Sequence, residues 1–294
     1  MNGSLILTGV VNGVVVGALY ALIGIGLTLL YGVLRVVNFA HGEFVIAGSF
    51  VAFVLFQRFG LPPLAALPVA GALFFAAGYA IYHLLMPRLK RSDDPESMSF
   101  LMMYGVSLAL AALMLLLFEA DSRSIDYSFT PVSVQVGTLF VSTARLVALG
   151  VGVALAVALG WFLYRTLPGK ALRGAIMNPE AIQIVGVNTT RLCALASGLA
   201  LALAAATGVL VALVFPAFTP FSGPEYTLIG FIVVVLGGLG NPLGALLAGV
   251  VYGVAEQLAT VFLPQAMAPI VGFLILVGSI MLRPAGLLGR QVRR

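Results

Sequence analysis

The chain has 294 residues, of which 61% are hydrophobic and only 9% are charged, and its mean hydropathy is +1.13. A soluble domain carries about 25% charged residues, so this composition excludes an ordinary soluble globular protein. The net charge is +5, yet the basic residues are confined to a few connections and the C-terminal end. This placement excludes a nucleic-acid-binding protein, which would need a basic stripe interleaved with aromatic residues.

Apolar runs near 20 residues long recur along the whole chain, and a run of that length crosses a bilayer as a helix. The predicted fold class is therefore an all-α polytopic membrane protein with about 8–9 transmembrane helices, some of them broken or half-helix elements. Cys193 is the only cysteine, so an internal disulfide and a cysteine metal cluster are both excluded. Because the N-terminal stretch has no basic region and a long apolar run, we expect a retained first helix.

The predicted spans are separated by short polar connections. They cover about residues 5–34, 44–56, 64–86, 98–118, 144–164, 192–215, two passes within 227–262, and 267–282. The first is about 45 Å long and should tilt or overhang a 30 Å hydrocarbon core. The 44–56 run is too short to cross comfortably, so it is either a half-helix or a span that begins in the preceding break. Nine spans are predicted, and eight is the alternative count.

A polar break, residues 35–43, separates the first two apolar runs and holds Asn38, His41 and Glu43. Ionisable groups at membrane depth are functional candidates by default. Because His41 and Glu43 lie next to Arg35 at the predicted membrane boundary, we favour a role for them in a structural gate or interface network. Contact with a transported solute and plain surface exposure remain the alternatives.

A second break is the glycine-rich segment 237–244, where we place the reversal between two spans. Gly237, Gly238 and Gly240 could expose backbone groups along a translocation path, or simply permit a tight turn and close packing. Residues 38–48 and 240–249 also resemble each other, since each is a break leading into a short apolar run that ends in Ala-Gly. Paired interrupted helices indicate a transport pathway, although the match is short.

Twelve of the 15 basic residues fall on one face if the spans alternate as predicted. They are Arg35, Arg88, Lys90, Arg91, Arg165, Lys170, Arg173, Arg191, Arg283, Arg290, Arg293 and Arg294. Basic connections are retained in the cytoplasm, so the C-terminus is predicted inside and the N-terminus outside.

The segment 165–191 is polar, but it contains a short helix signal. Asn178 suits an N-cap, Pro179 the first helical position, Glu180 the first turn and Gly186 the C-terminus. Its apolar residues Ala181, Ile182, Ile184 and Val185 exceed what a bare loop needs. Two interpretations stay open: an amphipathic helix resting on the membrane surface, or a docking helix for a cytoplasmic partner.

Four stretches carry a family resemblance. Residues 173–186, with Arg173, Asn178-Pro179-Glu180-Ala181 and Gly186, resemble the short form of the loop through which ABC importer permeases engage their ATPases. Residues 20–44 resemble the N-terminal signature of branched-chain amino acid permeases, and match the H-type subunit rather than its M-type partner. Residues 233–245 and 282–290 resemble a second signature and the C-terminal end of that family.

The resemblance implies a single transmembrane permease domain over residues 1–294, with a cytoplasmic coupling loop and helix at 165–191. Its ATPase-coupling residues would be Arg173, Asn178, Pro179, Glu180, Ala181 and Gly186. It implies a bacterial-type cytoplasmic membrane, a second permease subunit, two cytoplasmic ABC ATPases and an extracytoplasmic solute-binding protein, and no cofactor or metal. The substrate would be a branched-chain or related small amino acid.

No nucleotide-binding, zinc-protease or serine-hydrolase motif occurs in the sequence, so an ATP-driven mechanism would need separate ATPase subunits. One rival is an ion- or proton-coupled secondary transporter, whose deep acidic residues are nearly missing here. An intramembrane hydrolase is a second rival, and the sequence offers no paired nucleophile and base for it.

Overall fold

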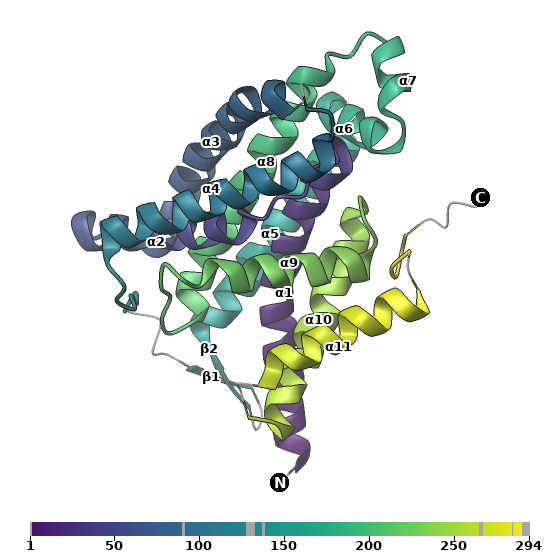
Figure 1. Ribbon diagram of the computed structural model, residues 1–294. Helices are drawn as coiled ribbons and strands as arrows, with labels where there is room; N and C mark the ends of the chain where they lie inside the picture. The colour runs from purple at the N-terminus through teal and green to yellow at the C-terminus, as the bar shows by residue number, and fades with distance from the viewer. Residues whose placement is uncertain are drawn as a thin grey trace.

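Helices dominate the computed structural model, which describes residues 2–89, 92–127, 133–136, 139–264, 267–283 and 285–289 (Figure 1). The helices are α1 (Asn2–Leu34), α2 (His41–Phe59), the 3-10 turn η1 (Pro63–Ala65), α3 (Ala66–Leu89), α4 (Pro95–Phe118), α5 (Thr143–Arg165), α6 (Leu167–Met177), α7 (Pro179–Ile184), α8 (Thr189–Val214), α9 (Gly223–Gly237), α10 (Pro242–Phe262) and α11 (Ala268–Leu282). The strands β1 (Ser133–Val136) and β2 (Leu139–Ser142) form an antiparallel hairpin.

The predicted all-α polytopic membrane fold is confirmed. Within the described residues, seven helices are long and apolar enough to cross a membrane, and α9 and α11 are shorter apolar helices. The 44–56 run belongs to a 19-residue helix that begins at His41, so it is a span that starts inside the break. The reversal predicted at 237–244 is also confirmed, because α9 ends at Gly237 and α10 begins at Pro242. With 15 residues each, α9 and α11 are only about 22 Å long, shorter than a hydrocarbon core.

Other boundaries differ from the prediction. The connection expected at 216–226 is already helical from Gly223, because Pro224 lies in the first turn, where its missing N–H costs nothing. The polar connection 119–142 contains the β1–β2 hairpin, which its sequence pattern did not predict; its residues 128–132 and 137–138 lie outside the described residues.

The central helix is α1, which packs along α10 through glycine-to-glycine contacts. Gly13 and Gly17 of α1 face Gly253 and Gly249 of α10 so closely that a Cβ at any of them would overlap the partner's backbone. In lipid, where burial gives no hydrophobic driving force between helices, such close backbone approach maximises van der Waals contact. Spaced four residues apart, these glycines form one stripe on each helix.

A second buried helix is α8, which packs against α2 and α3. Gly48 of α2 lies against the backbone of Ala205, and Gly208 against that of Val45, while Ser49 Oγ donates to the Gly208 carbonyl at 2.6 Å. In contrast, most of α3, α4 and α5 is exposed in this single chain. The core thus consists of α1, α2, α8, α9 and α10, with the exposed helices around it.

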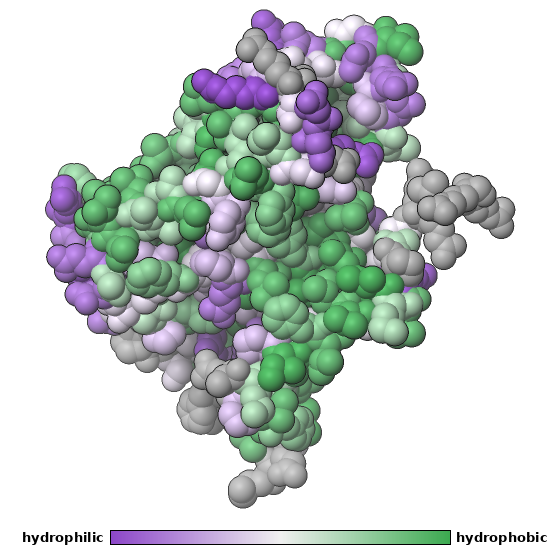
Figure 2. Space-filling model, in the orientation of Figure 1, coloured by the Kyte–Doolittle hydropathy of each residue, from purple (hydrophilic) through white to green (hydrophobic). Residues whose placement is uncertain are grey.

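One end of the bundle carries most of the basic residues. Contacts among the ends of α1, α3, α5, α6 and α8 bring Arg35, Arg88, Arg165, Lys170, Arg173 and Arg191 to this end. The tail after α11, with Arg283, joins it through Gly286 and Gly289, which pack on the α9–α10 turn. Figure 2 shows an apolar surface over α4, α9 and α11, with hydrophilic residues toward the α6–α7 end. Lys90, Arg91, Arg290, Arg293 and Arg294 lie outside the described residues.

Candidate coupling surface and translocation path

A helical elbow, residues 167–186, projects from the basic end of the bundle (Figure 1). It contains α6 as well as the predicted short helix α7, and α6 was not predicted. Asn178 makes the corner: its backbone N–H donates to Gly174 at the end of α6, and its Oδ1 accepts from the N–H groups of Glu180 and Ala181, both at 3.0 Å. The predicted N-cap is therefore confirmed.

The far end of α7 is also capped as its sequence indicates. Gly186 has φ +79°, and its N–H donates to Gln183 while the N–H of Val187 donates to Ile182. These two bonds form a Schellman motif, which requires the left-handed conformation that glycine adopts without strain. A six-residue helix with both ends closed in this way holds its shape without being buried.

The outer surface of the elbow is exposed and apolar. No residue of α7 is buried, and Ile184, Val185 and Met177 are 86%, 71% and 71% exposed. Glu180 and Ala181 are exposed beside them, and only Ile182 turns inward, onto Gly174. Such a cluster of large apolar side chains on an isolated capped helix is typical of a surface that inserts into a partner.

Arg173 is placed differently from the other predicted coupling residues. Its Nε donates to the Leu163 carbonyl at 3.0 Å, and its guanidinium lies 4.1 Å from the ring centre of Tyr164. Both partners belong to α5 of the same chain. The side chain therefore fixes α6 against the end of α5.

The 35–40 break and the start of α2 bury the three polar residues that the sequence singled out. Asn38, His41 and Glu43 are at most 2% exposed, which excludes the surface-exposure alternative. Asn38 Oδ1 accepts from the N–H of Ala40 at 3.0 Å, closing the turn into α2. His41 lies against Gly26 of α1, where the Ile23 backbone is near its ring.

Glu43 joins three helices. Ser107 of α4 donates to its Oε1 at 2.7 Å, and the carboxylate also faces Gly223 and Thr227 at the start of α9. Thr227 accepts from the N–H of Gly42 at 2.9 Å and donates to the Phe39 carbonyl at 3.1 Å. The break is thus a hydrogen-bonded junction of α2, α4 and α9, as an interface network requires.

Sequence reasoning missed Ser107 and Thr227, because single hydroxyl residues in apolar spans carry no motif. Glu256 of α10 and Asn12 of α1 are polar residues within apolar spans, a placement that favours interhelical hydrogen bonds over contact with a solute. Glu256 accepts from Tyr252 of its own helix at 3.3 Å and also hydrogen-bonds with Tyr20 of α1. Asn12 joins α1 to α5, since it accepts from Arg145 at 2.6 Å.

The predicted path glycines are closely packed. Gly237 lies on the backbone of Gly244, and Gly238 lies on that of Gly289. Gly240 lies against the Ile176 side chain of α6 and near Gly32 of α1. Gly238 and Gly240 have φ of +100° and +77°. The tail donates from Leu287 to the Leu236 carbonyl at 2.7 Å and from Leu288 to that of Gly237 at 3.3 Å. These contacts favour the tight-turn and close-packing interpretation of the three glycines.

An apolar pocket of about 370 Å³ opens between these two breaks. Its walls come from the end of α1, the 35–40 break and the second half of α9, and include Tyr31, Val36, Phe39, Phe231 and Val235. Phe39 stands between Phe100 of α4 and Phe231, with ring centres 4.3 and 4.9 Å away. The pocket offers space and apolar contact to a small aliphatic group.

Residues 9–280 match the family described as "Branched-chain amino acid transport system / permease component". The chain belongs to this family. The permease chain is 28% identical over 292 residues to the high-affinity branched-chain amino acid transport system permease protein BraD of Pseudomonas aeruginosa, with 95% of this chain and 94% of BraD covered. It is 29% identical over 292 residues to LivH of Escherichia coli K12, with the same coverage.

A probable branched-chain amino acid transport permease protein LivH of Methanocaldococcus jannaschii is 28% identical, with 95% of this chain and 91% of the relative covered. Among solved structures, PsaBC from Streptococcus pneumoniae in complex with Fab superposes with a TM-score of 0.51 at 15% identity, covering 96% of the permease chain and 92% of that chain. This likeness concerns the fold alone.

Proposed function

We propose that this chain is the transmembrane permease subunit of an ATP-binding cassette importer for branched-chain or related small amino acids. The observation that carries the proposal is α7, the exposed, doubly capped helix of the α6–α7 elbow, at the basic end of a permease of this family. The relatives named for branched-chain amino acid transport support the substrate class. A second permease subunit, two ABC ATPases and an extracytoplasmic solute-binding protein complete the assembly.

The basic end is assigned to the cytoplasm, which places the elbow where an ATPase could reach it. In this arrangement Glu180, Ala181, Ile184 and Val185 of the elbow contact the ATPase, and Asn178, Pro179 and Gly186 hold their helix in shape. Arg173 keeps the elbow attached to α5. Closure of the ATPases then moves α5 and α6 together, so that the spans alternate between outward and inward access.

The solute passes along the face that holds the apolar pocket and the junction around Glu43. A branched aliphatic side chain fits the pocket between Phe39 and Phe231, which is bounded by Val36 and Val235. Asn38, His41, Glu43 and the glycines at 237, 238 and 240 act as gate framework in this proposal. They hold the two broken elements in register rather than contacting the solute.

The coupling surface is tested by copurification of the ATPase with the permease after coexpression of all subunits. Glu180→Lys and Ile184→Glu should each abolish copurification and ATP-dependent leucine uptake while the permease still reaches the membrane. The matched control is Glu119→Lys, the same change at an exposed residue at the opposite end of α4 from the basic end. Wild-type copurification and uptake in both α7 variants would overturn the assignment.

The energy source separates this proposal from its main rival, an ion- or proton-coupled secondary transporter. Leucine uptake into cells expressing the full assembly should collapse when ATP is depleted and persist when a protonophore dissipates the gradient. The rival predicts the reverse.

The solute path is tested by narrowing the apolar pocket. Val235→Phe should lower leucine uptake more than alanine uptake, whereas Val277→Phe on the exposed side of α11 should change neither.

A further inference from the structure

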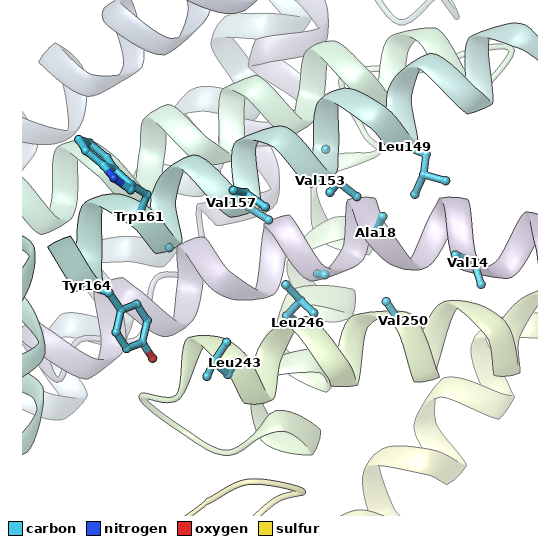
Figure 3. Close-up of a pocket in the computed structure, with 14 residues that line it drawn as sticks. Val14, Ala18, Leu149, Val153, Val157, Trp161, Tyr164, Leu243, Leu246 and Val250 are labelled. Carbon is cyan, nitrogen blue, oxygen red and sulfur yellow. The ribbon is translucent and has the colours of Figure 1, made fainter.

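A long apolar groove lies on the side of the bundle between α5 and α10, with α1 as its floor (Figure 3). Its volume is about 500 Å³. Small residues make the hollow, among them Ala18 and Ala21 of α1 and Gly152, Ala156 and Gly160 of α5. Larger side chains line its walls, with Val153 and Val157 on α5 and Leu246 and Val250 on α10 (Figure 3).

The groove has the dimensions of a single acyl chain. From Leu149 to Tyr164, the lining residues at its two ends on α5, the helix rises about 22 Å at 1.5 Å per residue. One leaflet including its headgroups is about 20–22 Å deep. The volume spread over that length gives a mean cross-section of about 23 Å², whereas a helix about 10–12 Å across has about 80–110 Å². A transmembrane helix of another subunit would therefore lie over the groove rather than fill it.

One end of the groove is amphipathic and positively charged. Trp161 and Tyr164 line it, as aromatic residues do at the membrane interface, and Arg165 ends α5 there. The Arg173 guanidinium lies 4.1 Å from the Tyr164 ring centre, so a fixed positive charge stands at the mouth. The sequence has no acidic residue between positions 143 and 179 to neutralise it.

We propose that this groove is a binding site for an anionic phospholipid, with one acyl chain along α1 and the phosphate between Arg165 and Arg173. The apolar lining supplies contact for the chain, and the two arginines select for negative charge. Bound lipid would fill the space between α5, which carries the elbow, and α10, which follows the glycine turn.

Trp161 is the only tryptophan of the chain, so its fluorescence reports on the groove directly. The full chain, assembled with its partners built without tryptophan, is reconstituted in phosphatidylcholine vesicles containing increasing fractions of brominated phosphatidylglycerol or brominated phosphatidylcholine. Brominated phosphatidylglycerol should half-quench Trp161 at a mole fraction at least about fivefold lower, the preference expected of one basic residue near a lipid headgroup.

Variants separate a built site from general lipid contact. Arg173→Gln should reduce the preference about fivefold, and Arg173→Lys, which keeps the charge, should retain most of it. Gly160→Leu should fill the groove and lower quenching by phosphatidylglycerol. Gly150→Leu is the matched control on the same helix, since both glycines have open space at the Cβ position but only Gly160 lines the groove.

Equal quenching by the two lipids, unchanged by Arg173→Gln and Gly160→Leu, would mean ordinary exposure to the bilayer and would overturn the proposal. Quenching by neither lipid would also overturn it, because the groove would then be covered by another subunit.

Discussion

Asn and Gly satisfy the backbone at two helix ends of this protein, one exposed and the other buried. The exposed one is α7 in the α6–α7 elbow, and the buried one is the start of α2 after the 35–40 break. In the elbow, Asn178 and Gly186 satisfy the ends of a helix that is wholly exposed. At the break, Asn38 accepts from the N–H of Ala40, and the N–H of Gly42 donates to Thr227. These bonds lie in the buried interior, where Glu43 is 1% exposed. Water can replace a lost hydrogen bond at the elbow, whereas nothing replaces it at the break. Substitutions at the break should therefore damage the fold, and those at the elbow should damage coupling.

The largest effect is expected at Gly42. A Cβ there would overlap the Gly223 carbonyl and crowd Thr227, and both lie in α9 backbone that cannot move aside cheaply. Gly42→Ala should destabilise the protein by about 3 kcal/mol or more, as overpacking in a tight core does. Thermal unfolding in detergent measures it. Gly71→Ala, in open space on α3, is the control and should leave the unfolding temperature unchanged.

Glu43 should show a smaller loss that depends on the replacement. Glu43→Ala leaves the buried Ser107 hydroxyl without its acceptor, at a cost of about 2 kcal/mol. Glu43→Gln keeps an oxygen acceptor and should cost less than half as much. The double variant with Ser107→Ala should recover part of the Glu43→Ala loss, because no orphaned donor remains. Equal unfolding temperatures for the Ala and Gln variants would contradict the junction described here.

Asn178→Ala should lower the local stability of α7 by about 1 kcal/mol, the usual contribution of an N-cap. The substitution removes both hydrogen bonds that the Asn178 side chain accepts from the N–H groups of Glu180 and Ala181. Hydrogen exchange of the α7 amides should accelerate about fivefold while those of α8 stay unchanged. Asn178→Asp, which keeps the cap, should behave like the wild type. Faster exchange throughout the bundle would mean that the elbow is part of the core.

The smallest change in stability should come from Ile184. Its side chain is 86% exposed, so Ile184→Ser should alter the free energy of unfolding by less than about 0.5 kcal/mol. Leucine uptake by the full assembly should nevertheless fall several-fold, because the apolar contact with the ATPase is lost. Uptake at the wild-type rate would contradict the contact between Ile184 and the ATPase, and would favour α7 as a helix that rests on the membrane surface.

The elements that the sequence predicted are those specified locally. Asn178, Pro179 and Gly186 indicate a helix start and stop from chemistry within a few residues, and the glycine run at 237–244 indicates a reversal for the same reason. The helix α6 was not predicted, because its first turn contains Pro168, Gly169 and Lys170, and this combination is typical of a loop.

What could not be predicted depends on how helices are rotated against one another. Glu43 and Ser107 are 64 positions apart, and nothing in either local sequence indicates their pairing. The contacts of Arg173, a predicted coupling residue, with Leu163 and Tyr164 of its own chain could not be predicted either, because they depend on α6 turning at Thr166 to lie along α5. The glycine stripes of α1 and α10 were evident as composition, yet their partners became clear only from the packing.

The tail on the α9–α10 turn has a consequence for biosynthesis. The carbonyls of Leu236 and Gly237 at the end of α9 receive hydrogen bonds from Leu287 and Leu288, and Asn241 donates to Leu288 at 2.9 Å. A ribosome must therefore add about 50 more residues after α9 before these two carbonyls receive their hydrogen bonds. A chain released before residue 287 would place α9 and α10 in the membrane with both carbonyls lacking these partners.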